Sequence, residues 1–240
     1  MAEHERHEPR DRREPVGTGL DRRAFMRLAG GGVFILFSAE AVGSADAVGS
    51  NEQGGGQRSY PDDFNAYLRI GEDGRVTCYS GKIEMGQANT TALAQMIAEE
   101  LEVPFDAVDM VMGDTRSCPW DGGTNGSRSI KYFGPAVRAA GAEAREVLVQ
   151  LAAERLKVPP ERLSARAGFI VDRENPGTRL AYGALAGGRR IERHLAEKPA
   201  LKAPADFHVI GRPLRRGDGP DKVTGRTKFT GDLRLPGMLY

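Results

Sequence analysis

Residues 81–87 read Gly-Lys-Ile-Glu-Met-Gly-Gln, and residues 122–129 read Gly-Gly-Thr-Asn-Gly-Ser-Arg-Ser. Each stretch is a polar turn that contains glycine and leads into a run with helical periodicity. Glycine lets the backbone approach a ligand without an intervening Cβ, and the first N–H groups of the following helix have no partner inside that helix. Such turns can therefore donate hydrogen bonds to an anionic group. We expect the two turns to bind one ligand from two sides.

Regular elements are expected on either side of these turns. Strand alternation, helical spacing of apolar residues and the proline positions predict a hairpin over 66–80, a helix from Thr90 or Thr91 to Pro104, a strand over 108–112 and a longer helix over 137–151. Gly134-Pro135 either starts the longer helix or kinks it. The fold class expected from this order is α+β, with a mixed sheet and helices packed on it.

An internal repeat links the two predicted helices. Residues 98–104 and 153–159 align at an offset of 55, and each reads as a helix end, a Val-Pro turn and then a strand. Either the sheet receives two comparable helix–strand units, or Val-Pro is a common way to stop a helix. Further along the chain, the pattern predicts a hairpin over 163–171, a short helix over 182–186 and a strand over 229–235.

Composition excludes several classes of function. The 240 residues carry 34 basic and 33 acidic side chains, a formal net charge of +1, so binding to nucleic acid is not expected. Cys78 and Cys118 form no Cys-x-x-Cys pair, and the four histidines are scattered, so we expect no metal site within this chain. Any iron–sulfur centre is expected on another polypeptide.

The first 47 residues resemble an export leader. A polar segment without apolar periodicity precedes Arg22-Arg23, an apolar run covers residues 28–37, and Ala45-Asp46-Ala47 has the form of a signal peptidase site. The run is too short to span a bilayer, so no stable membrane span is expected. Its alternative, the start of a buried helix, is disfavoured by three adjacent glycines. We therefore predict residues 1–47 to be a disordered leader with a twin-arginine signal, cleaved after Ala47, and the protein to be periplasmic.

The remaining chain divides by composition. Residues 48–59 are expected to be a linker, with folding from Tyr60, and residues 60–196 are expected to form the main domain. Residues 197–209, rich in Ala, Lys and Pro, are expected to be a second linker. Residues 210–240 are expected to begin a second domain.

Five short segments resemble the molybdopterin-binding domain of the xanthine dehydrogenase and aldehyde oxidase family, and most of all the isoquinoline 1-oxidoreductase large subunits. They are residues 83–87, 91–95, 98–101, 113–115 and 123–129. The resemblance implies an incomplete molybdopterin-binding domain of the xanthine dehydrogenase type over 60–196. It implies that 210–240 is the truncated start of an α/β hammerhead-like domain. In the family, the architecture continues well beyond the matched portion.

The resemblance also implies a chemistry. Family members use a molybdenum-molybdopterin cofactor, of which a cytosine dinucleotide form is one variant, and oxidise aldehydes or N-heterocycles with oxygen derived from water. Electrons pass to a [2Fe–2S] small subunit and, in some members, to a cytochrome c. The alternative is that this chain is a truncated, non-catalytic fragment that binds part of the cofactor or nothing by itself.

The resemblance assigns six cofactor-binding residues: Gly86, Gln87, Gly126, Ser127, Arg128 and Ser129. Ala88 replaces the third glycine of the family's Gly-Gln-Gly. Gln87 has the donors and acceptor to read a pterin edge, although it could instead cap its helix. Arg128 either faces a phosphate or lies on the surface.

No catalytic residue is assigned. In the family the base is a glutamate near the far end of the subunit, and nothing here matches it, so Glu84 is expected to be structural or solvated. A nucleotide-binding module using the same turns is a weaker alternative, because no Gly-x-x-x-x-Gly-Lys-Ser/Thr or Gly-x-Gly-x-x-Gly run follows a strand.

Overall fold

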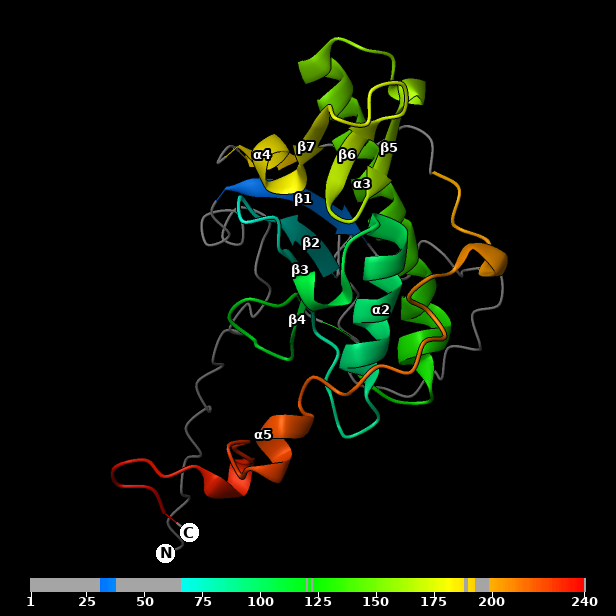
Figure 1. Cartoon of the computed structure of the whole chain (residues 1–240). Coiled ribbons are helices and arrows are strands. Elements are labelled where there is room, and N and C mark those ends of the chain that lie inside the picture. Colours follow the sequence, from blue (N-terminus) through cyan, green and yellow to red (C-terminus); the bar gives the residue numbers. More distant parts are fainter. Residues whose placement is uncertain are drawn as a thin grey trace, which may run out of the picture.

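The computed structural model describes residues 31–37, 66–119, 121, 123–187, 190–192 and 199–239. These residues form an α+β body in which two long helices lie against a mixed five-stranded sheet, with a small three-stranded sheet at one end (Figure 1). The predicted fold class is confirmed. Residues 1–30 and 38–59 of the predicted leader and first linker lie outside the described part, as do residues 60–65 of the predicted main domain.

The larger sheet has the order β4-β3-β2-β1-β8. Its strands are β1 Gly32–Phe37, β2 Ala66–Ile70, β3 Val76–Ser80, β4 Val108–Met112 and β8 Arg190–Glu192. The predicted hairpin is β2–β3, which pairs antiparallel from Ala66 with Ser80 to Ile70 with Val76. Strand β3 then pairs parallel with β4, the arrangement that a connecting helix makes feasible. The first glycine turn follows β3, and the second comes after β4, so both leave the same end of the sheet.

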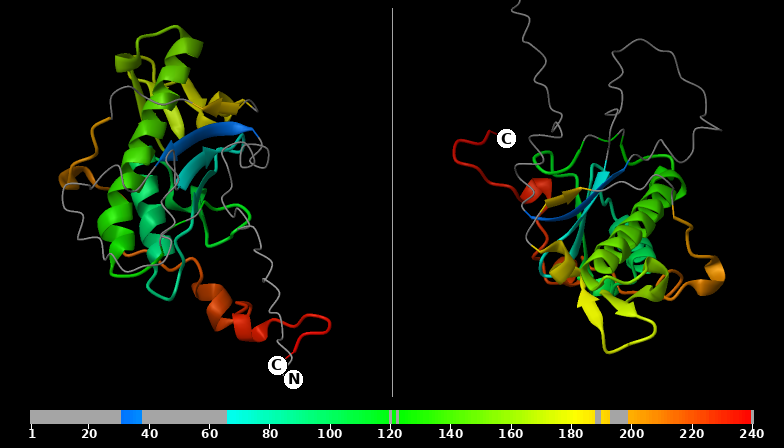
Figure 2. Two further views of the ribbon diagram at one scale, coloured as in Figure 1. Left: turned by 180° about the vertical axis from the view of Figure 1, so that it is seen from behind. Right: turned by 90° about the horizontal axis from the view of Figure 1, so that it is seen from above.

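Two helices cover one face of this sheet and lie side by side (Figure 2). They are α2, Asn89–Leu101, and α3, Gly134–Leu156, and both bury their apolar residues in the core against the sheet. Pro135 stands in the first turn of α3 and does not kink its interior; a π-helical turn, η4, Ser129–Phe133, leads directly into it.

The sequence repeat is a structural repeat. Helices α2 and α3 both end on a left-handed residue, Glu102 (φ 56°) and Lys157 (φ 59°). In each, the valine of the Val-Pro turn donates its N–H back to the helix, from Val103 to Ala98 O at 3.2 Å and from Val158 to Ala153 O at 3.3 Å. This is the helix-ending geometry in which late carbonyls find partners beyond the helix.

The two units nevertheless enter different sheets. Each Val-Pro turn leads through a 3₁₀ turn, η3 Phe105–Ala107 or η5 Pro160–Arg162, into a strand. Strand β4 joins the larger sheet, whereas β5, Leu163–Arg166, pairs with β6, Phe169–Asp172, and β6 pairs with β7, Arg179–Ala181. The expectation that one sheet receives both units is therefore wrong.

The apolar run assigned to the leader is partly a core strand. Residues 32–37 form β1, which pairs antiparallel with β2 over five residue pairs and parallel with β8 over three. The side chains of Val33, Phe34, Ile35 and Leu36 are buried. The predicted start of folding near Tyr60 was wrong, because a short apolar run has the same composition in an export signal and in a strand buried on both faces.

The C-terminal part of the described chain differs from its prediction in two ways. Residues 199–212, which include most of the second predicted linker, run along α2 through a short turn, η6 Pro204–Asp206. Residues 229–235 contain a 3₁₀ turn, η7 Thr230–Asp232, in place of the predicted strand, and no neighbouring strand in the described chain pairs with them. A five-residue helix, α5 Gly219–Val223, lies between these segments and projects from the body (Figure 1). The short helix predicted over 182–186 is α4, Tyr182–Ala186.

Candidate functional site

The two glycine turns meet at the end of the larger sheet. Lys82 Nζ lies 2.6 Å from Asp121 Oδ1 and donates to the carbonyl of Gly123 at 2.7 Å. The N–H of Ile83 donates to Thr124 Oγ1 at 2.9 Å. The structure thus brings together the two stretches that the sequence singled out.

The Lys82–Asp121 ion pair is the centre of this junction. The side chains are 6% and 1% exposed, so the charges interact in a medium of low polarity. Asp121 Oδ1 also accepts the N–H of Gly123 at 2.8 Å. Gly81 fits because a Cβ there would lie 2.5 Å from the Cβ of Asp121. Sequence reasoning missed both charged residues; their signal was an oppositely charged residue at the start of each turn.

Glu84 shapes the first turn. Its carboxylate accepts the N–H groups of Gly86 at 2.8 Å, Ala88 at 2.9 Å and Thr90 at 3.2 Å. Burial raises the pKa of this carboxyl, but the three N–H donors outweigh burial and the pKa is lowered overall. Glu84 is therefore ionised and fully engaged, which agrees with the expected structural role.

Gln87 is folded back on its own turn. Its Oε1 accepts the N–H of Met85 at 2.6 Å and its Nε2 donates to Ile83 O at 3.3 Å. The side chain does not cap α2, since the residue before that helix is Ala88, in the left-handed region at φ 62° and without a side-chain cap. Neither Thr90 nor Thr91 is the N-cap. Because Gln87 is exposed, its amide could exchange these two hydrogen bonds for a ligand's.

The second turn is open to solvent. Gly126 (φ 55°) and Ser127 (φ 57°) are both left-handed, and these two residues and Arg128 are exposed. Arg128 thus lies on the surface in this structure. Ser129 is buried, where it begins the helical run.

The hydrogen bonds between the turns come from Lys82 and Ile83. Among the described contacts, none joins Gly86 or Gln87 directly to residues 126–129. The six expected cofactor-binding residues therefore belong to turns that are held together at their bases, while their tips stay separate.

The residues present fit an anionic pterin in different ways on the two sides. Residues 129–156 form a continuous helical run, so the second turn stands at the positive end of a long helix dipole. On the first turn, no atom lies within 4 Å of the position that a Cβ on Gly86 would take, and its φ of 105° favours glycine. The first turn thus offers space, and the second offers donors.

A separate hollow of about 640 Å³ lies away from the turns. It is lined by charged residues of both signs, including Glu102, Arg145 and Lys202, and by none of the six expected residues. Several of its charges already pair with one another, as Lys202 does with Glu102. It does not compete with the turns as a cofactor site.

Comparison with known proteins identifies the relationship. The sequence profile of the molybdopterin cofactor-binding domain matches residues 29–228, which includes β1. One of the nicotinate dehydrogenase polypeptides of Pseudomonas putida is 37% identical over 174 residues, covering 72% of this chain and 14% of that protein. The isoquinoline 1-oxidoreductase beta chain of Brevundimonas diminuta is 29% identical, covering 94% of this chain and 33% of that protein.

Among solved structures, a Cu,Mo-CO dehydrogenase matches with 30% identity and a TM-score of 0.45 over 50% of this chain and 15% of that chain. The chain spans a third or less of the length of these relatives. The profile match covers most of the sequence and includes both glycine turns. The chain belongs to the molybdopterin cofactor-binding domain family of the xanthine dehydrogenase type, as the resemblance implied.

Proposed function

We propose that this chain supplies part of the molybdopterin site of a molybdenum hydroxylase large subunit. The observation that carries the proposal is the junction of the two turns through the buried Lys82–Asp121 pair. In this proposal, Gly86 and Gln87 hold the cofactor from one side, and Gly126, Ser127, Arg128 and Ser129 hold it from the other. The bound cofactor would accept the two electrons removed from the substrate.

Each group of residues has a task that its surroundings support. Gly86 leaves room for close approach, and the exposed Gln87 amide can read a pterin edge. The second turn offers exposed backbone and the Arg128 guanidinium for a pyrophosphate. No residue of this chain is assigned as the base.

The substrate class and partners follow the relatives. Their names include a nicotinate dehydrogenase and an isoquinoline oxidoreductase, so we propose an aldehyde or an N-heterocycle as the substrate. We further propose a [2Fe–2S] small subunit, with a cytochrome c as a further acceptor, and a cofactor that could carry the cytosine dinucleotide.

A second candidate is a non-catalytic role for this chain alone. It covers only 14% and 33% of two relatives, and in the described turns Glu84 already takes the N–H groups of Gly86 and Ala88. The chain would then bind part of the cofactor, or nothing, by itself.

Metal and pterin analysis after co-expression with a [2Fe–2S] partner separates these candidates. We expect molybdenum to co-purify with the chain, and we expect Gly126→Val, which places a branched side chain on the second turn, to reduce the metal content at least fivefold. Gly225→Val is the matched control, because Gly225 is also left-handed (φ 70°) and nothing lies within 4 Å of its Cβ position. Absence of molybdenum and pterin in the unmodified chain would reject the cofactor role, and turnover by the isolated chain would reject the non-catalytic one.

Export by the twin-arginine route remains part of the proposal, on the strength of Arg22-Arg23. Cleavage after Ala47 would remove β1, so we propose that an exported form keeps residues 32–37. In the described residues, no helix is both long and apolar enough to cross a membrane.

A further inference from the structure

A segment distant in the sequence is fastened to α2, the helix that follows the first glycine turn. The Glu99 side chain is fully buried, and one of its oxygens accepts three successive N–H groups, from His208 at 2.8 Å, Val209 at 2.6 Å and Ile210 at 3.0 Å. Its other oxygen lies 2.8 Å from Lys202 Nζ. Three N–H donors and an ammonium on one buried carboxylate make a specific anchor.

A second side chain of α2 holds the carbonyls of the same segment. Gln95 Nε2 donates to Val209 O and to Arg212 O, both at 3.0 Å. Residues 208–212, which we call the strap, are thus held through their N–H groups by one turn of α2 and through their carbonyls by the preceding turn. Sliding the strap along α2 would break all five hydrogen bonds.

The strap continues to a residue that reaches the first glycine turn. Arg216 Nη1 donates to the carbonyl of Gly86 at 2.6 Å, and Nη2 lies 3.4 Å from Glu84 Oε1. The same guanidinium makes a bidentate pair with Asp218, at 2.8 and 2.7 Å. Its donors are therefore already engaged by protein groups, so it acts as a brace and leaves anion binding to others.

Arg216 and Glu84 together fix both peptide groups of Gly86. Glu84 holds the N–H and Arg216 holds the carbonyl. These two hydrogen bonds restrain the backbone angles φ and ψ of Gly86 from both sides. Only residues 213–215 separate Arg216 from the strap, so docking of the strap brings this guanidinium to the turn.

We propose that Arg216 is a positioning residue that couples docking of the strap to the conformation of the cofactor turn around Gly86. The inference rests on the proposed function for the role of that turn, but the coupling itself is a property of the protein without cofactor. The coupled unit extends from α2 to Asp218, across the boundary at residue 210 that the sequence suggested.

Hydrogen–deuterium exchange of the full chain without cofactor tests the coupling. We expect Arg216→Ala to speed exchange in the peptide covering residues 83–90 at least fivefold, and Arg216→Lys to give an intermediate effect, since an ammonium cannot make the bidentate contact with Asp218. Arg215→Ala is the matched control: the side chain is exposed on the same segment, and we expect no change.

A milder change on α2 tests whether the strap delivers the effect. Gln95→Ala removes two strap contacts without touching the turn, and we expect it to speed exchange in residues 83–90 as well. If the coupling is real, adding Gln95→Ala to Arg216→Ala should speed exchange in that peptide little further, because both act through one path. Independent, multiplying effects would overturn the proposal.

Cofactor loading separates this proposal from the proposed function. Unchanged exchange in residues 83–90 for Arg216→Ala, with the strap still protected, overturns the positioning role whether or not the chain binds molybdopterin. Faster exchange with no molybdopterin in the unmodified chain supports the coupling and rejects the proposed function. Faster exchange with at least fivefold weaker loading of the variant supports both.

Discussion

Ala88 occupies a backbone conformation that suits glycine better. Its φ of 62° places the Cβ close to the following carbonyl, which costs a non-glycine residue about 1 kcal/mol or more. Part of the gain on changing it to glycine is offset by the greater freedom of glycine in the unfolded chain. We expect Ala88→Gly to raise the free energy of unfolding by about 0.5 to 1 kcal/mol in urea titrations. Ala92→Gly, inside α2, is the control and should lower it by about 1 kcal/mol.

Lys82 and Asp121 stabilise the junction only as a pair. Lys82→Met leaves a buried carboxylate without its counter-charge, which typically costs about 3 to 5 kcal/mol. We expect this loss of unfolding free energy by denaturant titration, and a smaller loss when Asp121→Asn is added, since no uncompensated charge then remains. A double variant that is less stable than Lys82→Met alone would contradict this account.

The buried charged residues that join the two turns were harder to predict from the sequence than the turn residues themselves. Glycines and the Gln87 amide stand out in a sequence because their types are unusual in that pattern, whereas Lys82 and Asp121 look like ordinary surface charges. Their pairing depends on a contact across 39 positions, which no local period reveals. The orientation of Gln87, turned back on Met85 and Ile83, depends likewise on the detailed path of the turn.

Docking of the strap on α2 depends on pH through the Glu99 carboxylate. Burial raises the pKa of Glu99, but Lys202 and the three N–H donors outweigh burial and lower it to about 2, from an ordinary value of 4.5. A lowered folded-state pKa means that this stabilisation is complete above about pH 4.5 and is lost as the pH falls through about 2. The lowering of the Glu99 pKa corresponds to a contribution of about 3 kcal/mol to the free energy of unfolding.

We therefore expect the amide NMR signals of His208, Val209 and Ile210 to titrate together below about pH 4, with a midpoint near pH 2. Glu99→Gln should remove this transition, and Glu102→Gln, on the adjacent surface, should leave it in place. Signals that titrate in the absence of the Glu99 carboxylate would show that another group controls the strap.

Strand β1 makes residues 32–37 of the predicted leader part of the fold. Its four buried side chains contribute together about 6 to 12 kcal/mol of apolar burial, which is comparable to the whole stability of a domain. We expect a chain that lacks residues 1–47 to lose cooperative thermal unfolding by circular dichroism. A chain that lacks only residues 1–28 keeps β1 and should unfold cooperatively; equal behaviour of the two would argue against the role of β1.

The elements that could be predicted were those with a local period. The β2–β3 hairpin, β4 and both long helices follow from alternation or helical spacing and from the Val-Pro stops. The pairing of β1 with β8 joins residues far apart in sequence. Likewise, no local pattern shows that β5 pairs with β6 in a second sheet and not with a strand of the larger one. Such choices depend on tertiary packing, which a pattern of single residues does not contain.

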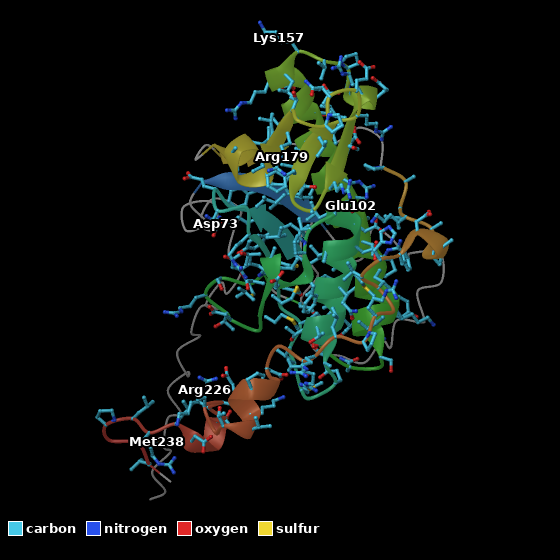
Figure 3. All side chains as sticks on the ribbon, viewed as in Figure 1. Asp73, Glu102, Lys157, Arg179, Arg226 and Met238 are labelled. Atoms are coloured by element: carbon cyan, nitrogen blue, oxygen red, sulfur yellow. The ribbon has the colours of Figure 1, made fainter. Side chains whose placement is uncertain are left out.

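At the scale of the molecule, apolar side chains remain exposed on the part that projects from the body. Val223 is 86% exposed, Leu235 68% and Leu239 93%. Figure 3 shows Arg226 and Met238 on this projecting segment, at the opposite end of the molecule from Lys157. Exposed apolar groups gathered on one segment are typical of contact surfaces.

We expect these side chains to drive self-association when no other polypeptide covers them. Val223→Ser with Leu235→Ser should leave the free energy of unfolding within about 0.5 kcal/mol and reduce oligomers in sedimentation velocity experiments. Thr227→Ser, a polar exchange on the same segment, is the control. Unchanged oligomers in the double variant would place the association surface elsewhere.

The pairing of β1 with β8 also sets an order of events in time. Gly32 must wait for Arg190 to leave the ribosome before the sheet can close on that side, so folding of this region comes late in synthesis. If the run after the paired arginines serves in the proposed export, a receptor can bind it only before the sheet closes, because the side chains of residues 33–36 are buried afterwards. Export and folding would thus compete for the same residues, 32–37, and the rate of translation would decide how much time the receptor has.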